Sequence, residues 1–330
     1  MEDINGKVLY LGYGLKLFET WRTKSGLLCS TDKGLKELIK SFASEKSIIF
    51  ESELKEYILG KGFKGITPNI KTVSGEYYYS LDKTKFCLRD FKNGRPADIT
   101  QKDELISASR ALACFHSLSC GFVSSAGAIN SKSALETFKK RRSELKRIKK
   151  NIGKRGSMSL VDIAVVKNYS YYIEKAELAI NLLSNSGYES IKSSSHQKRM
   201  ICHNSYKNDN IQLLENGEIF LPGFEKASCD SAVSDIAGFI RYIMKSPEFD
   251  TAWVFEALEH YSQARPLSSG ELYVIYGLLS FPYKFFKLLN SHYNRRQAYV
   301  SDAFIEKLNE CIASKEKNEL LLNEIRKIAF

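Results

Sequence analysis

The chain has 330 residues and a mass of 37.5 kDa, which is too long for one minimal core and suits two lobes or domains. Hydrophobic residues make up 43% of it and charged residues 26%, so a wholly disordered chain is excluded. The formal net charge of +11 favours anionic partners without choosing between nucleotides, nucleic acid, anionic polymers and acidic proteins.

Residues 1–95 are predicted to be strand-rich, because β-forming residues alternate with turn signals at "TKSG" and "STDKG". One helix is predicted within them, over residues 44–63, where Phe50, Leu54 and Ile58 share a face. Strand character returns after this helix. The pattern predicts a small antiparallel sheet with one helix packed on it.

The stretch "NGRP", residues 93–96, is a predicted turn or hinge between a small lobe, residues 1–92, and a mainly helical large lobe, residues 97–330. Periodic apolar residues predict helices in the large lobe over 103–118, 159–188, 232–245, 269–291 and 301–328. A β-hairpin is expected among these helices, because two short apolar runs, "IQLL" and "EIFL", flank the turn "ENGE".

Much of the excess of positive over negative charge comes from one run, residues 139–155. If the run is a helix, we expect it to be mostly a solvated face. A binding module for anionic polymers is the alternative, although the run has no interleaved aromatic residues for base stacking.

The seven cysteines are scattered and show no paired metal-ligand spacing, so we expect reduced thiols in a cytosolic chain. The N-terminal segment has no basic region followed by an apolar stretch, and no window of 18 apolar residues occurs. Neither a signal peptide nor a membrane span is therefore expected.

In their order and spacing, several segments resemble the CotS-type bacterial spore coat proteins. These proteins are a branch of the kinase-like fold shared with aminoglycoside and choline phosphotransferases. The segments that carry the resemblance are "STDKGLKELIKSF", "ELKEYILGKGF", "RDFKNGRP", "ALACFHSLSCGF", "NSGYESI", "ICHNSYKNDNIQLLENGEIFLPGFEKAS", "VSDIAGFIRYIMK" and "LLSFPYKFFKLLNSHY". The resemblance implies an α+β, bilobal protein-kinase-like fold, with a small β-rich N-lobe carrying one main helix and a larger, mostly helical C-lobe.

A kinase-like site needs a small-lobe lysine for the phosphates, a helix glutamate that orients it, a loop aspartate, an asparagine and a second aspartate for magnesium. By the resemblance, Lys40 takes the place of the phosphate-pairing lysine. Glu53 is its helix partner, with Glu51 and Glu56 as rivals. The alternative is that Lys40 and Glu53 are ordinary surface charges.

Two carboxylates that the family pattern requires are missing. The motif H-x-D-x-x-x-x-N runs from His203 to Asn210, but Ser205 stands at the position of the base. Gly223 replaces the metal-binding aspartate, while Glu225 remains acidic two residues later. Loss of a general base alone costs about 10²–10⁴ in rate, and loss of a metal ligand removes charge neutralisation as well.

Three further residues have structural roles by the same resemblance. Asp235 matches the aspartate that anchors the backbone of the catalytic loop, although a carboxylate in the first turn of a helix is also favourable by itself. His203 is expected to brace the loop by hydrogen bonds. His116 is interpreted as a core or loop-bracing histidine.

The resemblance therefore implies a catalytically inactive pseudokinase that acts in the assembly or structure of the spore coat. It would be made in the cytoplasm of the mother cell, with other spore coat proteins as partners and neither a membrane nor nucleic acid expected. The alternative is an active phosphotransferase for a small molecule or a protein, with Asp209 as a substitute base and Asn210 and Glu225 as metal ligands. No cofactor is assigned; ATP and magnesium are the ligands if nucleotide binding is retained.

Overall fold

The computed structural model describes residues 4–24, 26–246, 249–294 and 302–329, which form two compact units. Unit 1 comprises Met1–Asn130 and Ser195–Pro266, and unit 2 comprises Ser131–Ser194 and Leu267–Phe330. The chain therefore passes from the first unit to the second and back before it ends in the second. This division differs from the predicted one at residues 93–96, because part of the predicted large lobe belongs to the same unit as the small lobe.

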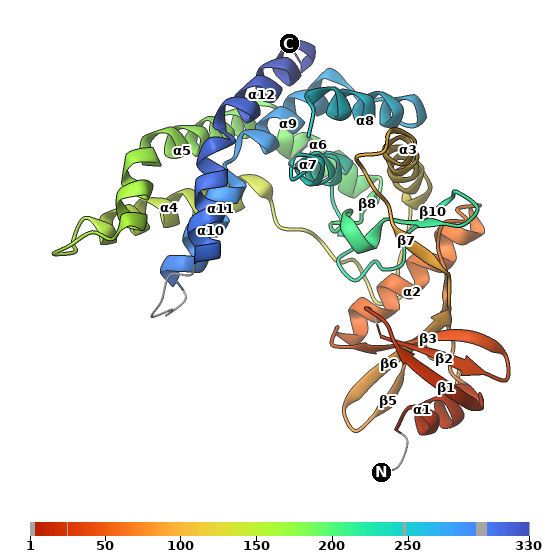
Figure 1. The fold of residues 1–330 in the computed structure, drawn as a ribbon. Coiled ribbons are helices and arrows are strands. Elements are labelled where there is room, and N and C mark those ends of the chain that lie inside the picture. The colour runs from red at the N-terminus through yellow and green to blue at the C-terminus, as the bar shows by residue number, and fades with distance from the viewer. Residues whose placement is uncertain (1–3, 25, 247–248, 295–301, 330) are drawn as a thin grey trace. The chain divides into compact units, whose positions relative to one another are not determined.

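The N-terminal part of unit 1 is built on an antiparallel sheet (Figure 1). Its strands, in spatial order, are β1 (Leu17–Arg22), β2 (Leu27–Thr31), β3 (Gly34–Ser41), β6 (Thr84–Asp90) and β4 (Asn69–Ile70), and β5 (Tyr79–Leu81) also pairs with β6. The tight turns predicted at "TKSG" and "STDKG" join the first three strands, as expected.

Two helices flank this sheet. The helix α2 (Glu45–Gly60) agrees with the predicted one, and the Ser44 hydroxyl caps it by accepting a bond from the Ser47 amide. The helix α1 (Ile4–Tyr13) corrects the prediction of strand structure at the N-terminus. The segment is rich in β-forming residue types, which led to the prediction of a strand. Its buried residues Val8, Leu9, Gly12 and Tyr13 nevertheless recur with the three- to four-residue spacing of one helical face. Val8 and Leu9 pack with Leu38 of β3 and Leu88 of β6.

The rest of unit 1 carries the loop whose chemistry is in question. Its elements are β7 (Gly94–Pro96), α3 (Lys102–Ser119), β8 (Ile201–Cys202), the 3₁₀ turn η1 (Asn208–Asn210), β9 (Gln212–Leu214), β10 (Ile219–Phe220), β11 (Ser228–Cys229), α7 (Ala232–Ile243) and α8 (Thr251–Ala264). The predicted hairpin is present as β9 and β10. The predicted hinge is largely the strand β7, which pairs with β9 in a three-stranded sheet.

Unit 2 is helical. It contains α4 (Ala134–Ile152), α5 (Leu160–Asn185), most of α6 (Tyr188–Gln197), α9 (Ser269–Ser280), α10 (Tyr283–Asn294), α11 (Asp302–Ala313) and α12 (Lys315–Ala329). One apolar cluster joins α4, α5, α10 and α11, where Leu145, Val165, Phe285 and Leu308 are buried together.

The stretch Ser269–Asn294 is long and apolar enough to cross a membrane by length and composition alone. Half of that window is buried inside the protein, and core helices of folded domains pass the same test, so this is weak support for a span. The stretch also corrects the prediction of one helix over 269–291. It is two helices, α9 and α10, because Phe281 leaves the helical conformation ahead of Pro282.

Candidate functional site

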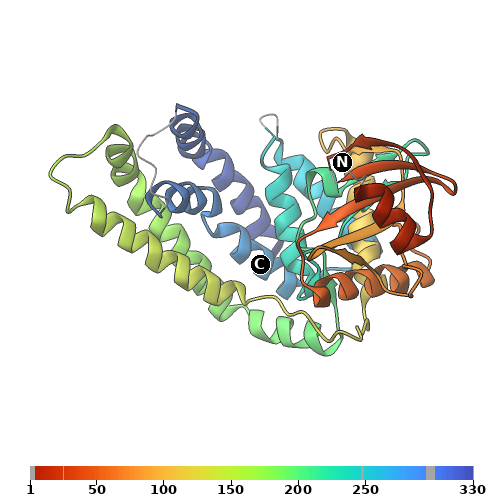
Figure 2. The same ribbon diagram turned by 90° about the horizontal axis from the view of Figure 1, so that it is seen from below.

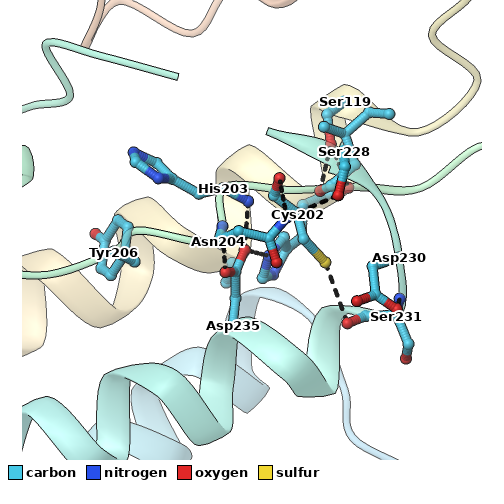
Figure 3. Close-up of polar contacts among 12 residues, drawn as sticks. Ser119, Cys202, His203, Asn204, Tyr206, Ser228, Asp230, Ser231 and Asp235 are labelled. Carbon is cyan, nitrogen blue, oxygen red and sulfur yellow. Dashed lines mark hydrogen bonds and ion pairs between the residues drawn. The ribbon is translucent and has the colours of Figure 1, made fainter. Parts of the chain in front are cut away.

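Asp235, in the first turn of α7, holds the backbone of the loop that follows β8 (Figure 3). Its Oδ2 accepts a hydrogen bond of 2.5 Å from the His203 amide, and its Oδ1 accepts one of 2.7 Å from the Asn204 amide. Burial acts to raise the pKa of this carboxyl, but His116 and the His203 amide hold that pKa below its ordinary value. Asp235 therefore occupies the loop-anchoring place that the resemblance implied.

His116 supports the same carboxylate from α3. Its Nε2 lies 3.0 Å from Asp235 Oδ2, and its Nδ1 lies 2.8 Å from the Tyr261 hydroxyl. In the described part of the chain, His116, Cys202 and Asp235 are the one grouping of three His, Cys, Asp or Glu side chains close enough to share a metal ion. Asp235 already accepts from two backbone amides and Cys202 Sγ already lies 3.1 Å from the Ser231 carbonyl, so the grouping is satisfied without a metal.

The side chain of His203 does not brace the loop through hydrogen bonds, which corrects the prediction. The ring is fully buried, and neither ring nitrogen has a hydrogen-bond partner among the residues described. It packs instead between aromatic rings, with centroids 4.8 Å from Phe224, 5.7 Å from Tyr206 and 6.2 Å from Phe115. Burial lowers the pKa of His203, and Asp235 only partly offsets this effect.

Ser205 and Asn210 are brought together as the family pattern requires, but they bond to each other. The Asn210 side-chain amide donates 3.0 Å hydrogen bonds to both the carbonyl and the hydroxyl oxygen of Ser205. The hydroxyl therefore stands at the base position as a partner of the asparagine. An uncharged hydroxyl with a high pKa is a poor proton acceptor near neutral pH.

Asp209, the predicted substitute base, has other partners. One of its carboxylate oxygens lies 2.8 Å from the Lys24 ammonium, at the start of the β1–β2 turn, and the other accepts from the Asn208 side chain at 3.1 Å. Both groups of the ion pair are solvent-exposed, so the pair contributes on the order of 1 kcal/mol or less. Breaking this pair would cost little free energy, but in the described part of the chain the Asp209 carboxylate makes no hydrogen bond with Ser205.

The Glu225 carboxylate occupies the space that a side chain at Gly223 would need. A Cβ atom built on Gly223 would lie 2.7 Å from Oε1 and 2.9 Å from Oε2 of Glu225. The backbone of Gly223 does not have the positive φ that would demand glycine. The one carboxylate that the family pattern leaves here thus lies against the position from which the missing aspartate would project.

A buried ion pair that the sequence analysis missed lies beside this segment. Arg89 on β6 donates from Nε and Nη2 to Glu37 on β3, at 2.8 and 2.6 Å. Its Nη1 donates to the Pro222 carbonyl. The side chains of Arg89 and Glu37 are only 5% and 9% exposed. The face of β3 next to Pro222 therefore carries the carboxylate of Glu37, which pairs with Arg89. In a kinase-like site a lysine of β3 binds the phosphates at this place.

Lys40 lies on the other face of β3. Side chains alternate along a strand, and the register of β3 with β6 is unbroken from Lys36 to Ser41, so Lys40 shares its face with Leu38 and not with Glu37. The exposed Lys40 ammonium lies 5.7 Å from the centre of the Phe42 ring. The structure thus does not bring Lys40 to the site or to Glu53, and its proposed phosphate contact has no geometric support.

The three glutamates of α2 each have a different partner. Glu51 pairs with Lys55 one turn later on the same helix, at 2.6 Å, and accepts a 3.2 Å bond from the Phe224 amide. Glu53 accepts from the Ser124 hydroxyl at 2.5 Å and from the Ser125 amide at 2.9 Å. Glu56 accepts from the Tyr77 hydroxyl at 2.8 Å.

Of the three, Glu51 is the one that reaches the segment after β10. Burial acts to raise its pKa, but Lys55, the Phe224 amide and Arg89 together hold that pKa below its ordinary value. The lysine that pairs with Glu51 is therefore Lys55 of α2 itself. The ion pair that the resemblance implied, between a lysine of β3 and a glutamate of α2, is not the one that Glu51 makes. Arg89 and Glu51 together hold the backbone of Pro222 and Phe224, on either side of Gly223.

These side chains do not fit a magnesium–nucleotide complex. Magnesium prefers carboxylate oxygens together with substrate phosphates. Here the Glu225 carboxylate lies against Gly223, Glu51 is engaged by Lys55 and the Phe224 amide, and Asn210 donates to Ser205. Glu37 on β3 and Arg89 on β6 pair with each other, so the Arg89 charge is already compensated on the protein side. In this arrangement Arg89 and Glu51 hold the backbone on either side of Gly223, and Asn210 and Ser205 bond to each other.

The sequence model of one family, described as "Spore coat putative kinase YutH", matches residues 6–325. Three solved structures share the fold. They are an aminoglycoside phosphotransferase from Alicyclobacillus acidocaldarius (TM-score 0.87, 15% identity, 96% of this chain and 94% of that one), spectinomycin phosphotransferase APH(9)-Ia (0.60, 12%, 99% and 96%) and the amicoumacin kinase hAmiN (0.60, 12%, 98% and 93%). These matches confirm the predicted bilobal kinase-like fold, and at such identities they carry the fold alone.

Proposed function

Because this chain belongs to the spore coat kinase family YutH, we propose that it acts in the spore coat as a pseudokinase. In this proposal the phosphotransferase fold serves coat assembly or coat structure, and its partners are other coat proteins. Synthesis in the mother cell and location in the coat are part of the same proposal.

The observation that carries the proposal is the bonding of Arg89. In a working kinase the β3 face next to the site carries a lysine that pairs with phosphates. In this chain that face carries the buried carboxylate of Glu37, and Arg89 joins it to the Pro222 carbonyl. Ser205 and Gly223 then remove the base and the metal ligand, so three separate requirements of phosphoryl transfer are unmet.

The first experiment is a thermal melt with ATP and magnesium, combined with a phosphotransfer assay. A ligand present at 100 times its Kd stabilises the native state by about 2.7 kcal/mol, which would raise the Tm of a chain of this size on the order of 5 °C. We expect no such rise and no transfer. A rise in Tm together with transfer that Asp209→Asn abolishes would end the pseudokinase proposal.

The second experiment restores the missing groups. Ser205→Asp places a carboxylate beside Asn210, and Gly223→Asp places a second one beside Glu225, whose flexible side-chain end can move aside. We expect a Tm rise with magnesium that the unaltered chain lacks. A matched control is Ser170→Asp with Gly156→Asp, which adds the same charges at two exposed positions of unit 2. Equal responses would contradict the assignment of this site.

An active phosphotransferase is the second candidate, and one observation favours it. The Glu225 carboxylate lies against Gly223, where a substitute for the missing aspartate would be useful. If this candidate holds, Glu225→Gln abolishes metal-dependent activity, whereas Glu218→Gln, at an exposed glutamate of the neighbouring hairpin, leaves it unchanged. Turnover that is insensitive to both changes would remove Glu225 from the mechanism.

A further inference from the structure

The net positive charge of the chain is concentrated on α4 and the turn after it. Residues 139–155 contain ten lysines and arginines and one glutamate, which gives +9 of the net +11 of the chain. The structure confirms that the exposed face of α4 carries these groups, while Leu145, Ile148 and Ile152 face the core of unit 2. The expected solvated face is present, but its charge is unusually concentrated.

Several arginines of this run have partners within unit 2, whereas several of its lysines are exposed to solvent. Arg141 lies over the Tyr283 ring at 4.9 Å, Arg147 pairs with Glu144 at 2.5 Å, and Arg155 pairs with Asp162 at 2.9 Å. Among the lysines, Lys139 pairs with Glu136 and Lys146 pairs with Glu177, and the exposed Lys149 lies with its ammonium 4.4 Å from the centre of the Tyr169 ring. The side chains of Lys140, Lys150 and Lys154 are exposed to solvent. The groups that can meet an external partner are therefore mainly ammonium groups on flexible stems.

Aliphatic side chains are exposed directly beside these lysines. Leu160 is 83% exposed, Ile163 is 50% exposed and Met158 is 47% exposed. Leu160, Ile163 and the exposed Lys167 are spaced three and four residues apart on α5, so they lie on one face of the helix. The opposite face, through Val161 and Val165, packs in the core, so this exposure is not needed to build the fold.

The lysines and the aliphatic residues form one surface, the α4–α5 tip, which comprises residues 149–167. The turn between the helices is short, and the Arg155–Asp162 ion pair ties it to the first turn of α5. Both views show this turn at the free end of the α4–α5 hairpin of unit 2, drawn in yellow-green (Figure 1, Figure 2). The tip is thus a single surface of cations around exposed aliphatic groups.

The residue types of the tip fit an anionic bilayer better than nucleic acid or an acidic protein. Nucleic acid would leave the aliphatic groups without a role, and residues 149–167 contain no aromatic side chain for stacking on bases. Protein interfaces are typically enriched in aromatic residues and arginine and depleted in lysine, the reverse of this tip. A bilayer with anionic headgroups accepts both components, because lysines attract the headgroups while aliphatic side chains enter the acyl boundary.

We propose that the α4–α5 tip docks on an anionic lipid surface, with Leu160, Ile163 and Met158 entering the bilayer edge and Lys149, Lys150 and Lys154 facing the headgroups. This is a peripheral contact and does not involve the stretch 269–294. It departs from the expectation that no membrane is a partner. It also stands apart from phosphotransfer, since every residue of the tip lies in unit 2.

The test is sedimentation of the full chain with vesicles of phosphatidylcholine, with or without phosphatidylglycerol. We expect binding only to the anionic vesicles, falling steeply between low and moderate salt. Lys149→Gln, Lys150→Gln and Lys154→Gln together should weaken it about 100-fold, at roughly 5-fold for each lysine. Leu160→Ser with Ile163→Ser should weaken it on the order of 10-fold or more. Because these side chains are exposed, circular dichroism melts should match those of the unaltered chain.

Matched controls lie in unit 1. Lys33→Gln, Lys64→Gln and Lys92→Gln remove the same charge from exposed positions, and Val73→Ser removes an exposed aliphatic group, so both should bind as the unaltered chain does. Failure to bind anionic vesicles, or equal loss in the controls, would overturn the proposal. Binding to heparin or polyglutamate that requires the lysines but ignores Leu160 and Ile163 would overturn it in favour of a general polyanion site.

Discussion

Arg89 is a cation held among buried partners, and its removal leaves a charge without compensation. We expect Arg89→Met to lower the free energy of unfolding by about 3–5 kcal/mol, because Glu37 would remain buried and unpaired. The double variant Arg89→Met with Glu37→Leu should recover most of this loss. Urea unfolding of the two variants and the unaltered chain measures the difference. If Arg89→Met were as stable as the unaltered chain, the ion pair would have no structural role.

His203 makes stability depend on pH, since its pKa is lower in the folded chain than the ordinary 6.5. The unfolded chain therefore binds a proton at His203 more readily than the folded chain does. The free energy of unfolding falls as the pH drops below the His203 pKa of the unfolded chain. The slope can reach about 1.4 kcal/mol per pH unit. We expect His203→Phe, which keeps the ring packing, to lose less stability than the unaltered chain between roughly pH 7 and pH 5.5. Equal losses by urea unfolding would assign the effect to other groups.

Among the helices, α5 begins with a capping box in which Ser159 and Asp162 satisfy each other's backbone amides. Ser159→Ala should lower the free energy of unfolding by about 1 kcal/mol, because one amide of the first turn loses its acceptor. Ser170→Ala, at an exposed position inside the same helix, removes no such bond and is expected to be neutral or slightly stabilising. Urea unfolding of both variants checks the comparison.

Elements with a clear period could be predicted from the sequence, whereas pairings between distant strands could not. The helices α2, α3, α5 and α7 and the hairpin β9–β10 follow from local spacing and turn residues. Glu37 and Arg89 meet only because β3 pairs with β6, a register that no local pattern specifies. The face of β3 on which Lys40 lies could not be read from the sequence for the same reason, since the face of a strand is set by its neighbours. Ser205 and Gly223 stood out only against the motif of a related family.

At the scale of the whole molecule, one apolar cluster lies within unit 1 and another within unit 2, and we expect the stabilities of the two units to be separable. Leu145 is fully buried in unit 2, so Leu145→Ala should cost about 2–5 kcal/mol. Amide hydrogen exchange should then accelerate in α4 and α5 and stay unchanged in β3 and β6. Leu88→Ala, in the sheet of unit 1, is the reciprocal variant and should give the opposite pattern. Uniform acceleration in both variants would mean that the chain unfolds as one cooperative body.

The conformation of Gly223 has an evolutionary consequence. Its backbone is open to any L-amino acid, and the nearest obstacle is the mobile end of Glu225. The single substitution Gly223→Asp would therefore supply the carboxylate that the family pattern expects at this position. The buried carboxylate on β3 is the harder barrier, because Glu37 and Arg89 would have to change together. Under the proposed pseudokinase function, we therefore expect a relative with phosphotransferase activity to differ from this chain at both Glu37 and Arg89.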